Sequence, residues 1–243
     1  MKINQLIQMV AVGLLLGTAS LADQPASDSE FFPSDGGIEV VLKNSSQDEI
    51  AQYFRAANAG EPDAQNIVGS CYLFGLHVKQ SYEEAVQWFR KAAEQGDAQA
   101  QFNLGLCYDR GWGVEPSKEK ALSWYRKAAE GGELQAQYNV GVCCAKGIGV
   151  SRSMKEAVKW FQMAAGNGFA VAQLALGSCY ATGDGIEQSN EKALYWYHKA
   201  AEQEQPDAML ILGNCYMGGL VRASAERRRG LQVASQSGGK GQR

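Results

Sequence analysis

Apolar and small residues recur along the chain in a pattern that repeats every 36 residues. The stretch AVQWFRKAAEQGDAQAQFNLGLCYDRGWGV begins at Ala85, and closely related stretches begin at Ala121, Ala157 and Ala193. A fainter copy begins at Tyr53, one period earlier. The pattern therefore predicts about five tandem repeats, between residues 46 and 219.

Each copy predicts two helices. In the first, Trp88 and Ala92 stand at i, i+4 spacing, and in the second Ala100, Leu104 and Cys107 again follow a helical period. Glycine, which adopts the positive φ of a helix stop at little cost, follows each helix. These glycines are Gly96, Gly132 and Gly168 after the first helix, and Gly111, Gly147 and Gly183 after the second.

Serine marks the start of the first helix in every copy. These serines are Ser45, Ser81, Ser117, Ser153 and Ser189. A serine hydroxyl that accepts from the orphan N–H groups of a helix start stabilises it by about 1 kcal/mol. Glu84 follows Ser81 by three residues, and Glu156 follows Ser153 in the same way, so the sequence predicts capping boxes at both.

A helix pair of this size cannot bury its apolar stripe alone, so the copies are expected to stack into an all-α, α/α solenoid. One glycine lies in the middle of every second helix, where it costs about 1 kcal/mol relative to alanine. We interpret these glycines as points of close helix contact. They are Gly69, Gly105, Gly141, Gly177 and Gly213.

The string A-x-x-W-[FY]-x-K-A-A-x-x-G, followed by A-x-x-x-L-G-x-x-Y-x-x-G-x-G-V, resembles the Sel-one-like repeat (SLR), a branch of the tetratricopeptide-like superfamily. The matching residues of one copy are Trp124, Tyr125, Lys127, Ala128, Ala129, Gly132, Ala136, Gly141, Gly147, Gly149 and Val150. The resemblance implies a right-handed superhelix that binds other proteins as an adaptor or scaffold. Two departures stand out: Gln52 replaces the tryptophan of the first copy, and the last copy loses its loop motif after Gly219.

The two ends of the chain carry different signals. Residues 1–22 resemble a secretory signal peptide, with an apolar run at 10–17 and a small-x-small pattern at 20–22, which predicts export to the periplasm or the medium. An uncleaved N-terminal anchor is the alternative. Residues 23–45 are expected to be a flexible leader, in which 38–43 is either a short strand or the remnant of a repeat.

Charge separates the last residues from the rest. Residues 220–243 carry a net +5, and removing them and Lys2 from the overall −3 leaves −9 for residues 3–219. An acidic body is a poor match for nucleic acid, so we expect none as a partner. The segment 220–243 is predicted to be a degenerate cap or a basic disordered tail, the one part expected to touch a membrane.

The cysteines follow the same period as the repeats. They are Cys71, Cys107, Cys143, Cys179 and Cys215, with Cys144 in a slot that holds tyrosine elsewhere. Packed helices lie about 8–10 Å apart, and a disulfide needs Cα atoms within about 7 Å. We therefore predict buried thiols, with a redox role for the Cys143–Cys144 pair or a metal site as alternatives. A metal site would be short of ligands, because His77 and His198 are the only histidines. The family resemblance adds that some secreted members pair this cysteine with one late in the first helix. Here that position is Ala93, Ala129, Ala165 or Ala201.

One catalytic pattern occurs. Ser117–Lys120 and Ser189–Lys192 match S-x-x-K, the nucleophile motif of penicillin-binding proteins and serine β-lactamases, but the companion S-D-N and K-T-G strings are missing from the sequence. The serines also serve as predicted helix caps. We expect no enzyme, cofactor or metal, and keep a weak β-lactamase-like hydrolase as the alternative.

A partner surface is predicted where the copies differ. The face of the second helix opposite its apolar stripe would form a mixed polar and apolar strip for an extended peptide or a partner's helix. An ordinary solvent-exposed face explains the variation equally well. Trp112, in a variable loop slot, is a further candidate or a loop residue folded onto the stack. The candidates are Asn103, Leu106, Arg110, Trp112, Asn139 and Lys146.

Overall fold

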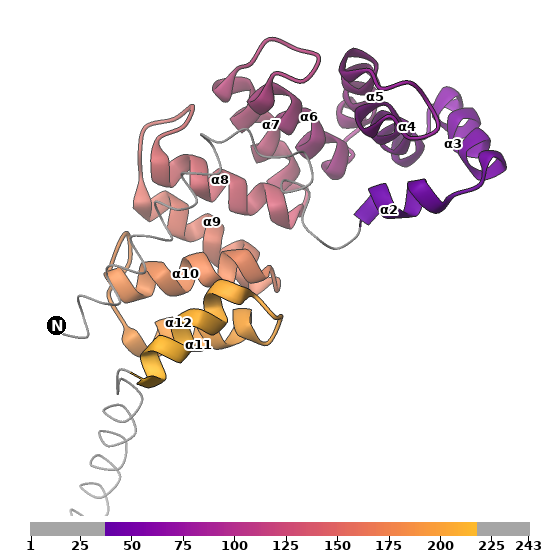
Figure 1. The fold of residues 1–243 in the computed structure, drawn as a ribbon. Helices are drawn as coiled ribbons and strands as arrows, with labels where there is room; N and C mark the ends of the chain where they lie inside the picture. Colours follow the sequence, from indigo (N-terminus) through magenta and orange to yellow (C-terminus); the bar gives the residue numbers. More distant parts are fainter. Residues whose placement is uncertain (1–36, 218–243) are drawn as a thin grey trace, which may run out of the picture. The chain divides into compact units, whose positions relative to one another are not determined.

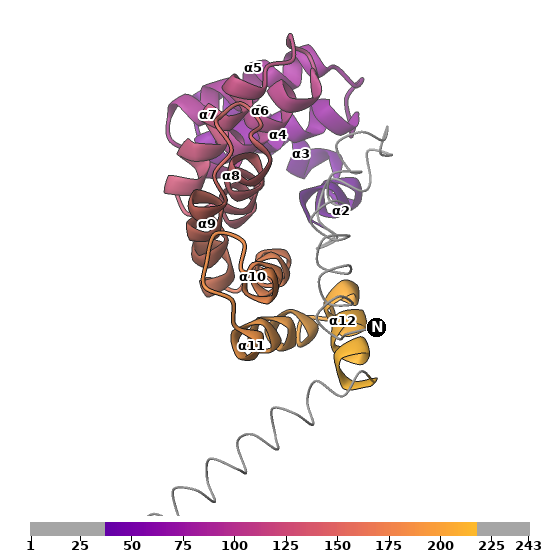
Figure 2. The ribbon, with the colours of Figure 1, turned by 90° about the vertical axis from the view of Figure 1, so that its left-hand side faces the viewer.

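The computed structural model describes residues 37–217, and every regular element in that range is an α-helix (Figure 1). The described chain forms two compact units, residues 37–167 and residues 168–217. The first unit contains α2 (Gly37–Asn44), α3 (Gln47–Ala59), α4 (Pro62–Phe74), α5 (Tyr82–Glu94), α6 (Ala98–Arg110), α7 (Lys118–Glu130), α8 (Leu134–Lys146) and α9 (Met154–Gly166). The second contains α10 (Ala170–Thr182), α11 (Asn190–Ala201) and α12 (Pro206–Met217), which follow one another in Figure 2.

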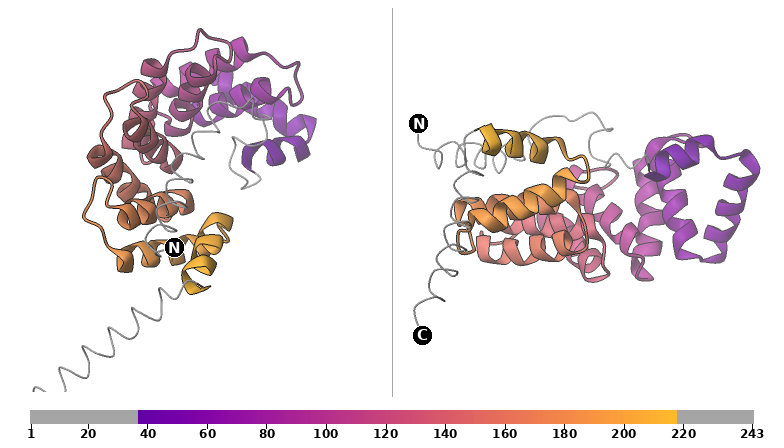
Figure 3. Two further views of the ribbon diagram at one scale, coloured as in Figure 1. Left: turned by 60° about the vertical axis from the view of Figure 1, so that its left-hand side comes forward. Right: turned by 90° about the horizontal axis from the view of Figure 1, so that it is seen from below.

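The predicted repeat of two helices is confirmed. Within the first unit α3, α4 and α5 lie side by side (Figure 3, right). Helices joined by the glycine-rich loop contact each other more extensively than helices joined by the tight turn: α4 packs more closely with α5 than with α3, and α8 more closely with α9 than with α7. We call α4, α6, α8, α10 and α12 the even helices, and α3, α5, α7, α9 and α11 the odd helices.

An aromatic ring lies against the glycine in the middle of an even helix. A Cβ atom added to Gly105 would lie 2.6 Å from ring atoms of Tyr125, which is closer than real Cβ contacts allow. The ring always comes from the odd helix that follows the loop. The four pairs are Gly69 with Phe89, Gly105 with Tyr125, Gly141 with Phe161, and Gly177 with Tyr197. The glycines therefore give each ring a buried position.

Serine caps four odd helices by the same geometry. Ser81, Ser117, Ser153 and Ser189 are the N-cap residues of α5, α7, α9 and α11, and each hydroxyl accepts from the N–H three residues later. The backbone N–H of each serine donates to a carbonyl of the preceding even helix. These carbonyls belong to Tyr72, Tyr108, Cys144 and Tyr180, at 2.8–3.0 Å.

Two of the predicted cap details are wrong. The N-cap of α3 is Ser46 rather than Ser45, whose hydroxyl instead donates to the carbonyl of Val41. A reciprocal capping box forms at Ser46 and Glu49, but not at Ser81 or Ser153. The reason is that the N–H of each of those two serines already donates to the carbonyl of the preceding helix.

The loop at residues 111–117 lies over the start of α5. The Trp112 ring stacks on Tyr82 with ring centroids 5.9 Å apart, and Gly113 lies against the main chain of Tyr82 and Glu83. Gly113 has φ +66°, so a side chain there would meet both backbone strain and a main-chain clash. The loop that follows α6 thus packs against the start of α5.

Residues 37–44, expected at the end of a flexible leader, form α2 instead of a strand. Leu42 is buried with Ile50 and Cys71, and this burial explains why the segment is ordered as a helix. The His77 ring nitrogen Nε2 also lies 2.7 Å from the carbonyl oxygen of Leu42. The predicted signal peptide at 1–22, the rest of the leader up to residue 36 and the segment 220–243 lie outside the described residues.

Across residues 37–217, none of the helices combines the length and the apolar character needed to span a bilayer.

A buried glutamine occurs in four of the even helices and hydrogen-bonds to at least one of the neighbouring odd helices. Gln65, Gln101 and Gln137 each donate from Nε2 to an alanine carbonyl of the preceding odd helix, at 3.1–3.2 Å. The Oε1 atom of Gln65 accepts from Gln95 at the end of the following helix, at 2.8 Å. In the second unit Gln173 accepts from Gln203 in the same way, at 2.9 Å.

Gln137 lacks the second bond. Its Oε1 atom is buried without a hydrogen-bond partner, because the residue equivalent to Gln95 and Gln203 is Asn167. The asparagine is one methylene shorter, and its Nδ2 donates to the carbonyl of Met163 instead. A buried acceptor without a donor destabilises the folded state.

We predict that Asn167→Gln raises the free energy of unfolding by about 1 kcal/mol, because the longer amide reaches the Oε1 atom of Gln137. Urea denaturation followed by circular dichroism measures the change. In a Gln137→Met background, which has no acceptor at this position, the same substitution should give no gain. An equal gain in both backgrounds would show that the bond is not the cause.

Candidate partner-binding site

Two of the predicted partner-binding residues are buried. Asn103 is 6% exposed and Leu106 is 1% exposed, so the prediction that they lie on an accessible face is wrong. The reason is that α6 is covered on every side along residues 100–107, which are buried without interruption. Asn103 Nδ2 also donates to Oδ1 of Asn66 on α4, at 2.9 Å, so this amide joins two even helices.

Arg110, Asn139 and Lys146 remain partly accessible. Arg110 lies at the end of α6 with 19% of its side chain exposed, and its Nε atom is 3.8 Å from Oδ2 of Asp109. Asp109 makes a shorter ion pair with Lys118, at 2.9 Å. Asn139 and Lys146 of α8 are half-buried, at positions equivalent to Asn103 and Arg110 of α6. The predicted partner-binding face is therefore buried in the middle of α6 and more exposed to solvent on α8.

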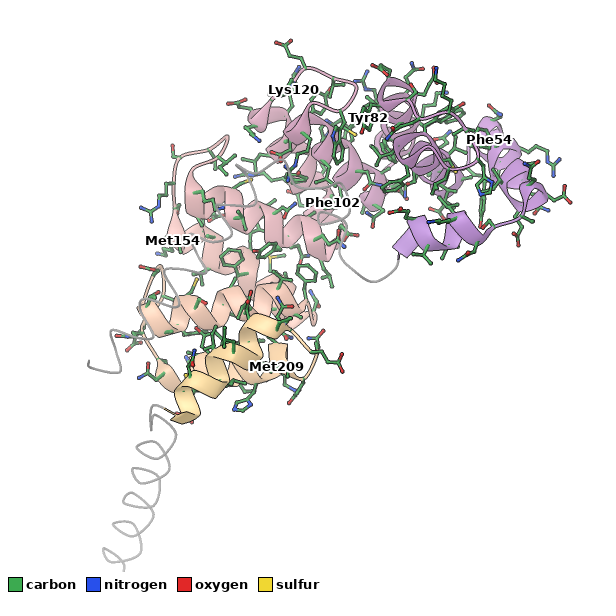
Figure 4. All side chains as sticks on the ribbon, in the orientation of Figure 1. Phe54, Tyr82, Phe102, Lys120, Met154 and Met209 are labelled. Atoms are coloured by element: carbon green, nitrogen blue, oxygen red, sulfur yellow. The ribbon has the colours of Figure 1, made fainter. Side chains whose placement is uncertain are left out.

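Trp112 is half-buried because its ring stacks on Tyr82 at the start of α5 (Figure 4 labels Tyr82). This contact corresponds to the alternative interpretation of Trp112 as a loop residue folded onto the stack. Tyr82 lies 30 residues before Trp112, so local sequence around the loop does not reveal this contact.

Other polar side chains lie beside these positions. Gln99 of α6 is exposed and donates to Asn103 Oδ1 at 3.4 Å, and Gln135 occupies the equivalent half-buried position on α8. We call Gln99, Arg110, Gln135, Asn139 and Lys146 the amide–basic row. Amide groups both donate and accept, and the two cations donate, so the row offers hydrogen-bond partners to peptide groups and carboxylates.

The two S-x-x-K serines act in helix starts. Ser117 Oγ accepts from the Lys120 backbone N–H at 3.3 Å and donates to Glu119 at 3.1 Å. The Lys120 ammonium lies over the Tyr108 ring, 5.4 Å from its centroid, and Lys192 lies over Tyr180 in the same way. A nucleophile needs its base within hydrogen-bond reach of the hydroxyl, and here the lysine side chains are directed at rings.

All six cysteines are free and buried. Burial raises the pKa of Cys107, Cys143 and Cys179 to about 12 and that of Cys71 to about 11. Cys144 is 1% exposed, and burial also raises its pKa. Because thiolates are the reactive form, the Cys143–Cys144 pair is poorly placed for redox chemistry. Within residues 37–217 there is also no group of three His, Cys, Asp or Glu side chains suited to hold a metal ion.

We predict that the folded protein resists alkylation by iodoacetamide at pH 8, and that all six thiols react once it is unfolded in urea. Mass spectrometry counts the modified thiols. Rapid native labelling of Cys143 or Cys144 would contradict the prediction.

The raised thiol pKa values also predict how stability depends on pH. Below the ordinary thiol pKa of about 8.5, the thiols keep the proton in both the folded and the unfolded state. As the pH rises from there towards 12, only the unfolded state ionises, so stability should fall over that range.

The structure resembles solved Sel1 repeat structures. A protective antigen of uropathogenic Escherichia coli strains, which displays an SLR fold, is 40% identical with a TM-score of 0.68 over 70% of this chain. The match spans 36% of that protein, so the present chain covers about a third of its length. A Sel1 repeat protein from Oxalobacter formigenes is 35% identical over 70% of this chain and 76% of its own, with a TM-score of 0.62. None of the curated protein sequences compared with the chain matches it.

Comparison with protein families matches the Sel1 repeat at residues 62–97, 98–133, 134–169, 170–204 and 206–228. In this frame a repeat begins with an even helix and ends with the odd helix after the loop, one helix out of phase with the unit predicted from residue 46. The frame agrees with the more extensive packing across the loop. Sel1 repeat proteins are generally scaffolds for protein–protein interaction. By these matches over most of its length, the chain belongs to the Sel1 repeat family.

Proposed function

We propose that the chain is an exported, non-enzymatic scaffold that binds a protein partner through the amide–basic row. The observation that carries the proposal is that the residues repeated in every copy are used for packing or capping, whereas the residues of the amide–basic row are not. Repeated side chains such as Gly105, Tyr125 and Ser117 are used in packing or capping, while the row varies in exposure and chemistry between α6 and α8.

The chemistry of the row selects the kind of partner. Gln99, Gln135 and Asn139 suit the peptide groups of an extended segment, whose N–H and C=O are regularly spaced. Arg110 and Lys146 favour an acidic side chain in that segment, because each contributes a positive charge to the row. We therefore propose an extended, acidic peptide segment of a partner protein as the ligand class.

Capture experiments test this surface. We expect the chain from residue 23 onward to capture a partner from an envelope extract or a host lysate. The triple variant Arg110→Ala, Asn139→Ala, Lys146→Ala should lose at least nine-tenths of the captured protein, because it removes both charges and one amide. Quantitative mass spectrometry of the bound material gives the measurement.

The control variant is Arg55→Ala, Lys155→Ala, Gln162→Ala, which removes the same two charges and one amide from exposed positions on α3 and α9. It should retain the partner. Equal capture by both triple variants, or no captured protein from either source, would refute the proposed surface. Measurable hydrolysis of a chromogenic β-lactam that is abolished by Ser117→Ala would favour the hydrolase instead.

Export is the second part of the proposal, and the sequence of residues 1–22 supports it. We expect the chain produced in a bacterium to reach the periplasm or medium with Asp23 as its first residue, which intact-mass analysis of that fraction detects. Ala22→Arg should block processing, because signal peptidase requires a small residue before the cut. A full-length chain that stays in the membrane fraction without the substitution would indicate an uncleaved anchor.

A further inference from the structure

The turn after α9 carries the only Asn-Gly pair in the sequence, at Asn167 and Gly168. Both residues and the preceding Gly166 are exposed. Asn167 is the C-cap of α9, with φ −88° and ψ 11°, and Gly168 has φ +94°. Asparagine before glycine is chemically labile, because the glycine nitrogen stands next to the side-chain amide and glycine adds no Cβ atom to hinder their approach.

The fold itself requires the glycine of this pair. Gly96 and Gly132, at the equivalent positions of the two preceding repeats, have φ +94° and +96°, in the left-handed region that other residues adopt only with strain. The residue before the glycine varies, and it is Gln95 or Gly131 in those repeats. Because asparagine occupies this position only at the end of α9, the labile pair is specific to this turn.

The two glycines beside Asn167 leave room for its side chain to move. Outside the adjoining backbone, no described atom lies within 4 Å of a Cβ atom built on Gly166 or on Gly168. The Asn167 amide Nδ2 donates to the carbonyl of Met163, at 3.0 Å. Once that hydrogen bond opens, the side chain can turn towards the Gly168 nitrogen, because a glycine on each side lets the backbone rotate without a side-chain clash.

Two other asparagines separate the effect of the glycine from that of exposure. Asn44 and Asn58 are exposed, and each donates from Nδ2 to the carbonyl four residues earlier, at 3.0 and 2.8 Å. Asn167 makes the same bond over the same spacing. The residues that follow Asn44 and Asn58 are Ser45 and Ala59, and both carry a Cβ atom. These two asparagines are therefore internal references for Asn167.

We propose that Asn167 is a site of spontaneous deamidation that loosens the end of α9. The main-chain nitrogen of Gly168 attacks Cγ of Asn167, so an N–Cγ bond forms, the Cγ–Nδ2 bond breaks, and ammonia leaves with the main-chain proton. Water then opens the cyclic imide. Cleavage at Cγ gives aspartate, and cleavage at the main-chain carbonyl carbon gives isoaspartate. The reaction consumes only water and needs no oxidant or cofactor.

Both products weaken the end of α9. The amide of Asn167 donates to the carbonyl of Met163, whereas an ionised carboxylate only accepts, so this hydrogen bond is lost. The new negative charge also lies at the C-terminus of the helix, where the macrodipole favours positive charge. Isoaspartate in addition adds a carbon atom to the main chain of the turn. Because ammonia is lost to solvent, the modified fraction grows with the age of the protein.

Peptide mapping of the purified, folded chain tests the site. During incubation in mildly alkaline buffer, the peptide that contains Asn167 should gain the mass difference between OH and NH₂ and separate into aspartate and isoaspartate forms. We expect Asn167 to convert at least about tenfold faster than Asn58, a barrier lower by about 1.4 kcal/mol, and faster than Asn44 as well. Asn167→Gln keeps an amide but requires a larger ring for the attack, so residue 167 should then stay unmodified.

Three results would overturn the site. Conversion of Asn167 no faster than that of Asn58 would show that the native turn protects the amide, even if the urea-unfolded chain reacts rapidly. Equally rapid conversion of Asn44, Asn58 and Asn167 would make exposure the cause, and not the following glycine. Conversion that requires an added cell extract would assign the reaction to an enzyme.

Hydrogen exchange measures the effect on α9. Asn167→Asp, which reproduces the aspartate product, should speed exchange of the last-turn amides of α9 by about threefold and leave those of α7 unchanged. The matched control Asn190→Asp makes the same substitution at the exposed first residue of α11, where the macrodipole favours a negative charge. It should not speed exchange in α11. Unchanged exchange at the end of α9, or an equal increase in α11, would overturn the loosening.

Discussion

The contact between a mid-helix glycine and an aromatic ring sets the spacing of each helix pair. In unit 37–167 the ring of Phe161 occupies the space that a Cβ of residue 141 would fill, and Phe89 and Tyr125 do the same at residues 69 and 105. The glycine costs about 1 kcal/mol in helix propensity, and burial of a large apolar side chain returns about 1.5–3 kcal/mol. Burial of the ring therefore offsets the helix-propensity cost of the glycine in each of these repeats.

A main-chain hydrogen bond holds the start of each odd helix in the same place. The backbone N–H of the capping serine donates to a backbone carbonyl two residues before the end of the preceding even helix, so the donor and the acceptor are both main-chain groups. The side chain at the acceptor position is therefore free to change. Cys144 stands where other repeats have tyrosine, and its carbonyl still accepts from Ser153 at 2.8 Å.

The same packing explains why the variable positions are not all available to a partner. Even helices contact neighbours on several sides, so Asn103 and Leu106 differ from their equivalents while lying inside the protein. Their variation reflects local packing, as the bond between Asn103 and Asn66 shows. The cysteines, in contrast, recur at one repeat position because each occupies the same kind of buried site. Burial raises the pKa of these thiols and keeps them protonated.

For the described residues, the sequence by itself determined the ten helices of the repeats, α3–α12, together with four of the five capping serines and four of the five glycines of close contact. These features repeat in register every 36 residues, and each follows from local backbone chemistry or from helical periodicity. It also predicted the thiols as buried, because their spacing places them on the packing stripe.

Only the tertiary structure decided which face of a helix is open. Helical periodicity divides a helix into an apolar stripe and an opposite face. It does not predict that both faces of α6 are buried, because the opposite face is covered by residues distant in sequence, such as Asn66. The tertiary structure likewise decided that residues 37–44 form a helix, since the burial of Leu42 against Ile50 and Cys71 is a long-range contact. Local patterns fix local structure, and exposure depends on the neighbours that the folded chain brings together.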